Sequence, residues 1–178
     1  YFKRRWKMDS LELNKSKYKV SNIKDILQNK LILAKPLTKD DIKELNLVNP
    51  PVYNKEKYLI QEQWLYSMNI GEWEDVEIII QGNNENPEVR IIELAERIFD
   101  ELHLHISRAL AYLHKFFPNQ EINSYYLSTI SFGNMANFDS YIFSGFSLDF
   151  IYEGHFEFQY KVKFKENGWP IGFEGGPL

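Results

Sequence analysis

Four histidines are the first side chains to test for chemistry, because imidazole acts as a catalytic base and as a metal ligand near neutral pH. His103 and His105 stand two residues apart in a helical pattern, so their side chains would point about 200° apart and cannot share a metal ion. Glu101 and His105 have the i, i+4 spacing of two ligands on one helix, but no third ligand accompanies them. The sequence therefore predicts no metal site and no cofactor.

Carboxylates are the next candidates, and Asp149 stands near a predicted strand end, where catalytic carboxylates can lie. The chain has no Walker, GxSxG, HExxH or GxGxxG motif, so we assign no catalytic residue. A small hydrolase or ligand-binding enzyme remains an alternative hypothesis. It would have to gather four residues in one cleft, within about 10 Å of one another: Glu101, His105, Asp149 and His155.

Aromatic side chains are unusually frequent, with 13 Phe, 11 Tyr and 4 Trp, which together make 16% of the chain. Most of them should pack in the core, because rings bury large apolar areas. Exposed rings are also enriched where proteins bind one another. We take three residues in predicted turns as candidate binding residues: Trp73 in a hairpin connection, His155 in a Glu-Gly-His turn, and Trp169 beside an Asn-Gly turn.

Composition narrows the classes of partner and the compartment. The 178 residues carry 21 basic and 25 acidic side chains, interspersed, with a net charge of −4, so we expect no nucleic-acid partner. No apolar run is long enough to span a bilayer, so we expect no membrane-spanning segment within these residues. The absence of cysteine excludes disulfides and thiolate sites and fits a cytoplasmic location.

One long helix should position much of the molecule, over residues 87–117. Asn86 is a suitable N-cap and Pro87 a suitable first residue, while Pro118 ends the run. A straight helix of this length would be about 46 Å long, and a domain of this size is about 40 Å across, so we expect a bend or break near His103–Ser107. Its apolar stripe steps by three or four residues: Ile91, Ala95, Ile98, Leu102, Ile106, Ala109, Leu113 and Phe116.

Strands are predicted on both sides of this helix. Before it, Tyr58–Met68 and Val76–Ile80 form a hairpin around Asn69-Ile70-Gly71. After it, the clearest alternation of apolar and polar residues occurs in two segments that end at Tyr152 and Phe164. Asn167-Gly168 predicts a type I′ turn, and Pro170 makes the last strand an edge strand. The predicted strands are Leu31–Ala34, Tyr58–Met68, Val76–Ile80, Tyr125–Phe132, Phe138–Phe143, Phe146–Tyr152, Phe156–Phe164 and Trp169–Phe173, with a loop at Gly133–Asn137.

The grouping of strands before and after the helix indicates the α+β class. We expect an antiparallel sheet of about five to seven strands, with the long helix packed on it and short N-terminal helices at 21–28 and 38–47. Residues 16–178 would form a single domain, and residues 1–15 an N-terminal tail. The opening YFKRRWKM is interpreted as a trimmed start, or as the cytoplasmic flank of a membrane segment.

The second half of the chain, from Trp64 to Gly176, resembles a family of uncharacterised bacterial domains of unknown function (family 2262-like). The resemblance rests on the Trp-containing hairpin, the long helix that ends in aromatics, the segment DFIYEGHFEFQYKVKF, the ENG turn and the final Gly-Gly. The Asp-Gly-Asp approach to the Gly-His turn is replaced here by Ile151-Tyr152. The resemblance implies a small α+β protein, of a kind that includes immunity proteins, and it highlights His155.

The leading functional hypothesis is a non-enzymatic, protein-binding domain of the immunity type. It rests on many rings, a modest acidic charge and no catalytic constellation. An acidic surface could neutralise a basic partner such as a nuclease toxin. The alternatives are the small enzyme described above and a cytoplasmic domain of a membrane-anchored protein.

Overall fold

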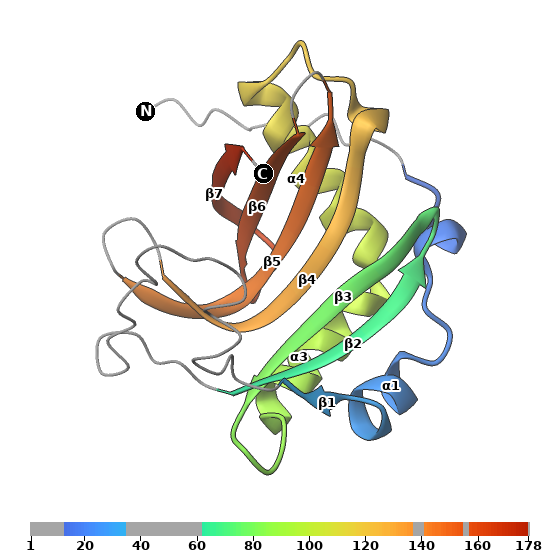
Figure 1. Cartoon of the computed structure of the whole chain (residues 1–178), viewed down its shortest axis with the longest axis vertical. Helices are drawn as coiled ribbons and strands as arrows, with labels where there is room; N and C mark the ends of the chain where they lie inside the picture. The colour runs from blue at the N-terminus through green and yellow to red at the C-terminus, as the bar shows by residue number, and fades with distance from the viewer. Residues whose placement is uncertain (1–12, 35–61, 137–140, 155–156, 178) are drawn as a thin grey trace, which may run out of the picture.

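A seven-stranded sheet with helices on one face forms the molecule, in the order β1-β2-β3-β4-β5-β6-β7 (Figure 1). The computed structural model describes residues 13–34, 62–136, 141–154 and 157–177. The predicted α+β class is confirmed. The strands are β1 (Ile32–Leu33), β2 (Glu62–Ile70), β3 (Trp73–Gly82), β4 (Tyr125–Ala136), β5 (Ile142–Glu153), β6 (Glu157–Lys165) and β7 (Pro170–Pro177).

Neighbouring strands are antiparallel with one exception, the β3–β4 pair, which is parallel. The helices lie between these two strands in the sequence, and such a crossover brings the chain back to the end of the sheet from which β3 began. The predicted antiparallel sheet is therefore mostly, but not wholly, antiparallel.

The predicted long helix is two helices, α3 (Val89–Asp100) and α4 (Leu102–Phe116), separated at Glu101. Glu101 has φ −125° and ψ 28°, so the break lies just before the region in which we expected it. The buried side chains of both helices face the sheet, and the change of direction lets each helix follow its curvature.

The start of α3 also differs from the prediction. Its N-cap is Glu88, whose backbone N–H donates to the Gln81 carbonyl oxygen (3.0 Å), and Pro87 forms a β-bridge with Gly82. Asn86 and Pro87 therefore lie beside the end of β3, because their backbone continues the pairing of the strand before the helix begins.

Short elements precede the sheet: the 3₁₀ turn η1 (Lys15–Tyr18) and the helix α1 (Ile23–Asn29). α1 packs against α3, and η1 packs against α4. The predicted helix at 38–47, the first four residues of the predicted strand Tyr58–Met68 and the tail up to residue 12 lie outside the described residues.

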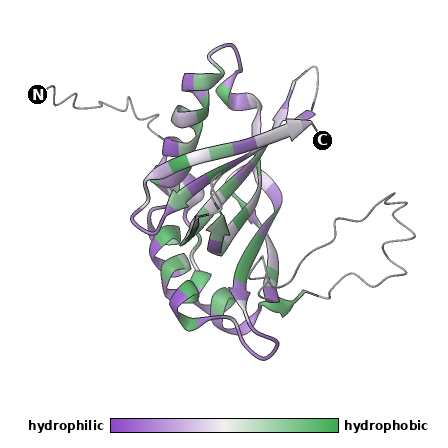
Figure 2. Cartoon of the chain, turned by 90° about the vertical axis from the view of Figure 1, so that its left-hand side faces the viewer, coloured by the Kyte–Doolittle hydropathy of each residue, from purple (hydrophilic) through white to green (hydrophobic). Residues whose placement is uncertain are grey.

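The apolar face of the sheet is the one that the sequence alternation predicts. Phe146, Leu148 and Phe150 of β5 are fully buried, and the rings of Phe146 and Phe164 stack with centroids 4.7 Å apart. Figure 2 shows the layers from the side, with the helices to the left of the sheet and β7 crossing in front (Figure 2). The helices and this face enclose the hydrophobic core.

β4 continues to Ala136 and so includes the first four residues of the stretch Gly133–Asn137, which we predicted as a loop; Asn137 lies outside the described residues. Gly133 has φ +147°, and a Cβ there would lie 2.3 Å from the side-chain oxygen of Gln81. That oxygen accepts a hydrogen bond from the Asn134 N–H (2.5 Å). Glycine is therefore needed within the strand for a close approach, rather than for a turn.

The β6–β7 turn is not the predicted type I′ turn. Gly168 N–H donates to the Lys165 carbonyl oxygen (2.8 Å), and Lys165 N–H donates to that of Trp169 (3.1 Å), which closes a three-residue loop. Gly168 has φ +77°, while Asn167 has no positive φ. This is a three-residue hairpin with glycine in the left-handed position, and β7 is an edge strand as predicted.

Candidate functional site

Trp73 lines a pocket of about 550 Å³ at the end of the sheet where β3 begins. It is the first residue of β3 rather than part of the hairpin connection, and it is 6% exposed. The turn is made by Gly71 and Glu72, and Gly71 has φ +64°. A Cβ at Gly71 would lie 2.9 Å from the Tyr18 ring, so glycine lets the turn rest on that ring.

Rings form much of the pocket wall. The Tyr18 and Trp73 rings lie 5.3 Å apart, and Tyr125 completes the wall from the first residue of β4. Burial raises the pKa of Tyr18 and of Tyr125, so both phenols are neutral at physiological pH. The indole N–H of Trp73 has no hydrogen-bond acceptor in the part of the chain that the structure describes.

The pocket also carries charge. Glu72 from the β2–β3 turn and Glu153 from the end of β5 line it, and Lys17 is its one described cation. Lys17 Nζ lies 2.5 Å from Glu72 Oε2 and 5.6 Å from the Tyr18 ring centroid. The Glu153 carboxylate has no ion pair or hydrogen bond with any described residue. The lining therefore has more negative than positive charge.

Trp169 lies on a different surface, at the start of the edge strand β7, and it is 60% exposed. The Arg108 guanidinium of α4 lies 6.0 Å from its ring centroid and donates to the Gly168 carbonyl oxygen (3.2 Å). Along α4 and β7, further rings continue the line from Arg108. Tyr112 stacks edge-on with Phe116 (5.3 Å), and the Phe116 ring lies 5.1 Å from that of Phe173.

We call these five residues the aromatic row: Trp169, Arg108, Tyr112, Phe116 and Phe173. Arg108, Tyr112 and Phe116 are four residues apart on α4, so they form one stripe about 12 Å long. Phe116 is 54% exposed, which leaves both ends of the row open to solvent. The row borders the edge of β7 that no described strand pairs with.

His105 is buried beneath the β6–β7 turn. Its ring packs edge-on against Phe146 (5.1 Å) and Phe164 (6.2 Å), and a Cβ at Gly168 would lie 2.5 Å from it. Burial, with a smaller effect of the Arg108 charge, lowers the pKa of His105 to about 4. Its Nδ1 has no hydrogen-bond partner among the described residues. His105 is thus a neutral core residue.

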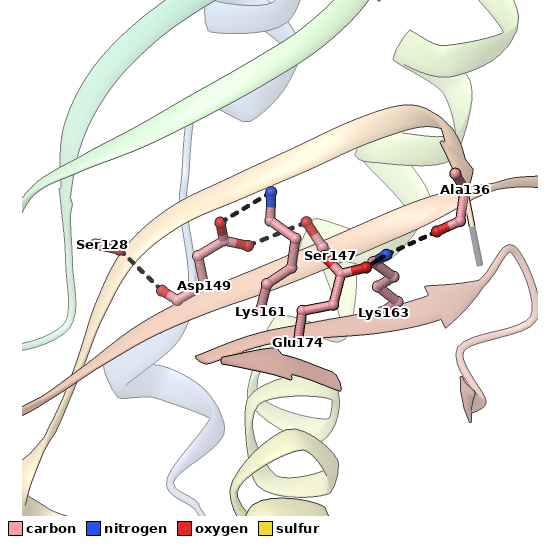
Figure 3. Close-up of polar contacts among 7 residues, drawn as sticks. All are labelled: Ser128, Ala136, Ser147, Asp149, Lys161, Lys163 and Glu174. Atoms are coloured by element: carbon pink, nitrogen blue, oxygen red, sulfur yellow. Dashed lines mark hydrogen bonds and ion pairs between the residues drawn. The ribbon is translucent and has the colours of Figure 1, made fainter. Parts of the chain in front are cut away.

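Asp149 lies on the opposite face of the sheet, in a polar cluster shown in Figure 3 (Figure 3). Its carboxylate accepts a hydrogen bond from Ser147 Oγ (3.1 Å) and pairs with Lys161 (3.3 Å). Burial raises the pKa of Asp149, and Lys161 opposes that shift. Beside this pair, Lys163 forms an ion pair with Glu174, so each of the two lysines in the cluster has one carboxylate partner.

The sheet curls over this polar cluster. Lys163 Nζ donates to the Ala136 carbonyl oxygen (2.7 Å). The strand register, however, places Lys163 opposite Ser147 of β5, which in turn lies opposite Ser131 of β4. The five residue steps from Ser131 to Ala136 would span about 16 Å in a flat strand, so β4 must bend back. Figure 3 shows it arching over the side chains, which explains why Lys163 and Asp149 are buried on the face away from the helices.

The structure does not bring together the residues of the enzyme hypothesis. His105 lies on the helix side of the sheet and Asp149 on the other, while Glu101 is exposed at the α3–α4 break. His155 lies outside the described residues. No group of three His, Asp or Glu side chains in the described ranges could hold a metal ion. No helix in those ranges is long and apolar enough to cross a membrane.

Comparisons of the chain with protein-family models, with curated proteins and with solved structures find no match. The resemblance proposed from the sequence therefore stays a prediction. Sequence reasoning singled out Trp73 and Trp169 as candidates but not the residues that the structure places around them. Tyr18 and Arg108 join these tryptophans from distant segments, and no spacing in the sequence signals either contact.

Proposed function

We propose that this chain is a non-enzymatic domain that binds another protein through the aromatic row. The observation that supports this proposal is that Trp169 and Phe116, two large apolar side chains, remain exposed at the ends of one row. Binding hot spots are enriched in tryptophan, tyrosine and arginine, and the row contains all three.

The rings of the row are held in place before any partner arrives. Arg108 fixes the β6–β7 turn through its bond to the Gly168 carbonyl oxygen, and Phe173 lies against both Tyr112 (6.2 Å) and Phe116. A surface that is already ordered loses little side-chain entropy on binding. The exposed rings would enter apolar pockets of the partner, and the guanidinium would face a carboxylate or carbonyl group.

The edge of β7 offers a second set of contacts. An extended segment of a partner could add to such an edge through backbone hydrogen bonds, with the flanking rings giving specificity. Pro170 and Pro177 at the two ends of β7 limit how far such pairing could extend. The narrower hypothesis of an immunity-type role, in which the partner is a toxin, is tested by the identity of the bound protein.

Site-specific photo-crosslinking in the source cell tests the proposal. A photoreactive phenylalanine analogue replaces Trp169 in one variant and Val89 in a matched control, because Val89 is equally exposed (69%) on α3. We expect a discrete heteromeric adduct from position 169 that is absent from position 89 and is lost when Phe116→Ala is added. Identical adducts from both positions, no adduct at all, or an adduct with a second copy of this chain would each overturn it.

A further inference from the structure

We infer that the pocket at Trp73 is a binding site for an organic cation, an alkylammonium group with its attached carbon chain. The site is separate from the aromatic row and does not depend on the proposed protein binding. Its volume of about 550 Å³ lies within the range of small-molecule sites, about 300–1,000 Å³. Three largely buried rings, those of Tyr18, Trp73 and Tyr125, line it.

The charges select a cation over an anion. Two carboxylates, those of Glu72 and Glu153, line the pocket, and the Lys17 ammonium is the one described positive charge there. Burial raises the pKa of Tyr126, and the negative charge of Asp75, just outside the pocket, raises it further. Glu153 adds a smaller effect in the same direction. An ammonium group over an aromatic face gains from the ring quadrupole, and the gain is largest where water is excluded.

The protein already shows this recognition with its own side chain. The Lys17 ammonium contacts both the Glu72 carboxylate (2.5 Å) and the Tyr18 ring (5.6 Å to its centroid), and Tyr18 Oη lies 3.5 Å from Glu72 Oε1. Lys17 and Glu72 are 41% and 55% exposed, so this contact can open to admit another cation. Glu153, with no partner among the described residues, offers the second carboxylate.

Titration calorimetry with choline tests the inference, and 3,3-dimethyl-1-butanol serves as its uncharged isostere. We expect choline to bind at millimolar concentrations and to shift the nuclear magnetic resonance signal of the Trp73 indole N–H, while the alcohol binds at least about threefold more weakly. Nα-acetyl-lysine N-methylamide distinguishes the two sources of the cation. Tighter binding of this probe indicates a protein lysine, and tighter binding of choline indicates a free quaternary amine.

The Lys17→Met variant distinguishes a cation site from an anion site by the direction in which the affinity changes. For a cation it removes an internal competitor, so choline should bind about two- to fivefold more tightly. For an anion it would remove the only described positive charge in the pocket and weaken binding. Glu153→Gln should weaken choline binding by a similar factor. Glu88→Gln should leave it unchanged, because Glu88 is exposed and bonded to the far end of β3.

Three results would overturn the inference. The first is no heat and no shift of the Trp73 indole signal with either cation. The second is equal affinity for choline and its uncharged isostere. The third is weaker choline binding by Lys17→Met. None of these bears on the aromatic row, so failure here is distinguishable from failure of the proposed protein binding.

Discussion

At the scale of single residues, two buried titratable side chains, His105 and Asp149, have structural roles. They lie on opposite faces of the sheet and form no catalytic pair. His105 is held neutral by the rings of Phe146 and Phe164, and Asp149 is held in a polar cluster with Lys161. A catalytic pair needs contact through hydrogen bonds or a shared cleft. Here the sheet separates the two groups, so each should influence stability instead of turnover.

His105 should make the fold less stable in acid. Its pKa is about 4 in the folded protein and about 6.5 when unfolded, so between these values the unfolded chain binds more protons. The free energy of unfolding should fall by at most about 3 kcal/mol as the pH drops from about 6.5 to about 4. His105→Phe keeps a ring between its neighbours and should abolish this decline in urea titrations. An identical pH profile for this variant would contradict the assignment.

Asp149 should change the free energy of unfolding with pH in the opposite direction. Because burial raises its pKa in the folded state, the folded protein binds more protons just above the unfolded pKa of 3.8. Its ionisation should therefore reduce stability as the pH rises through this window. We expect the stability of Asp149→Asn, relative to wild type, to increase with pH above 3.8, measured by chemical denaturation. A relative stability that decreases with pH would show that Lys161 outweighs burial.

At the scale of single elements, the β6–β7 turn depends on Gly168 for two reasons: its φ of +77° and its contact with His105. Gly168→Ala should lower the free energy of unfolding by about 1–3 kcal/mol, from backbone strain and a clash with a buried ring. Gly176→Ala in β7 is the matched control, because nothing lies within 4 Å of a Cβ there. Thermal unfolding of both variants checks this, and equal stabilities would refute the described turn.

The same elements show what the sequence could predict. Alternation gave the buried faces of β5 and β6 correctly, because a strand with one face in the core must alternate. The stripe from Ile91 to Phe116 likewise predicted helix, and all of its members are buried except Phe116, which is 54% exposed at the end of α4. The length of the helix predicted its break, but the break lies at Glu101, just before the expected region near His103–Ser107, because curvature of the sheet decides its position. The strand through Gly133 was predicted as a loop, because the contact with Gln81 decides it. Such causes are tertiary and leave little local signal.

The candidate sites were less predictable than the fold. Trp73 and Trp169 were chosen as rings in predicted turns, but Trp73 is buried in the wall of a pocket and Trp169 is exposed. Tyr18 lies 55 residues before Trp73 in the chain, and Arg108 lies 61 residues before Trp169. Contacts over such separations are set by topology and not by local pattern.

At the scale of the whole molecule, the sheet separates three surfaces with different chemistry. The curled face encloses a balanced polar cluster, the end of the sheet holds a ring-lined acidic pocket, and the α4–β7 side carries the aromatic row. The cluster satisfies its own charges, since each lysine there has a carboxylate partner. Among the described surfaces, the pocket and the row are the two for which we propose binding partners.

Titration of the crosslinked partner into wild type and Trp169→Ala tests the central claim most directly. The account predicts that removing this ring weakens binding by at least about 2 kcal/mol, roughly thirtyfold, as for a hot-spot anchor. Val89→Ala, which removes an equally exposed apolar side chain from α3, should change the affinity less than about twofold. If Trp169→Ala binds the partner as tightly as wild type does, the aromatic row is not the binding surface.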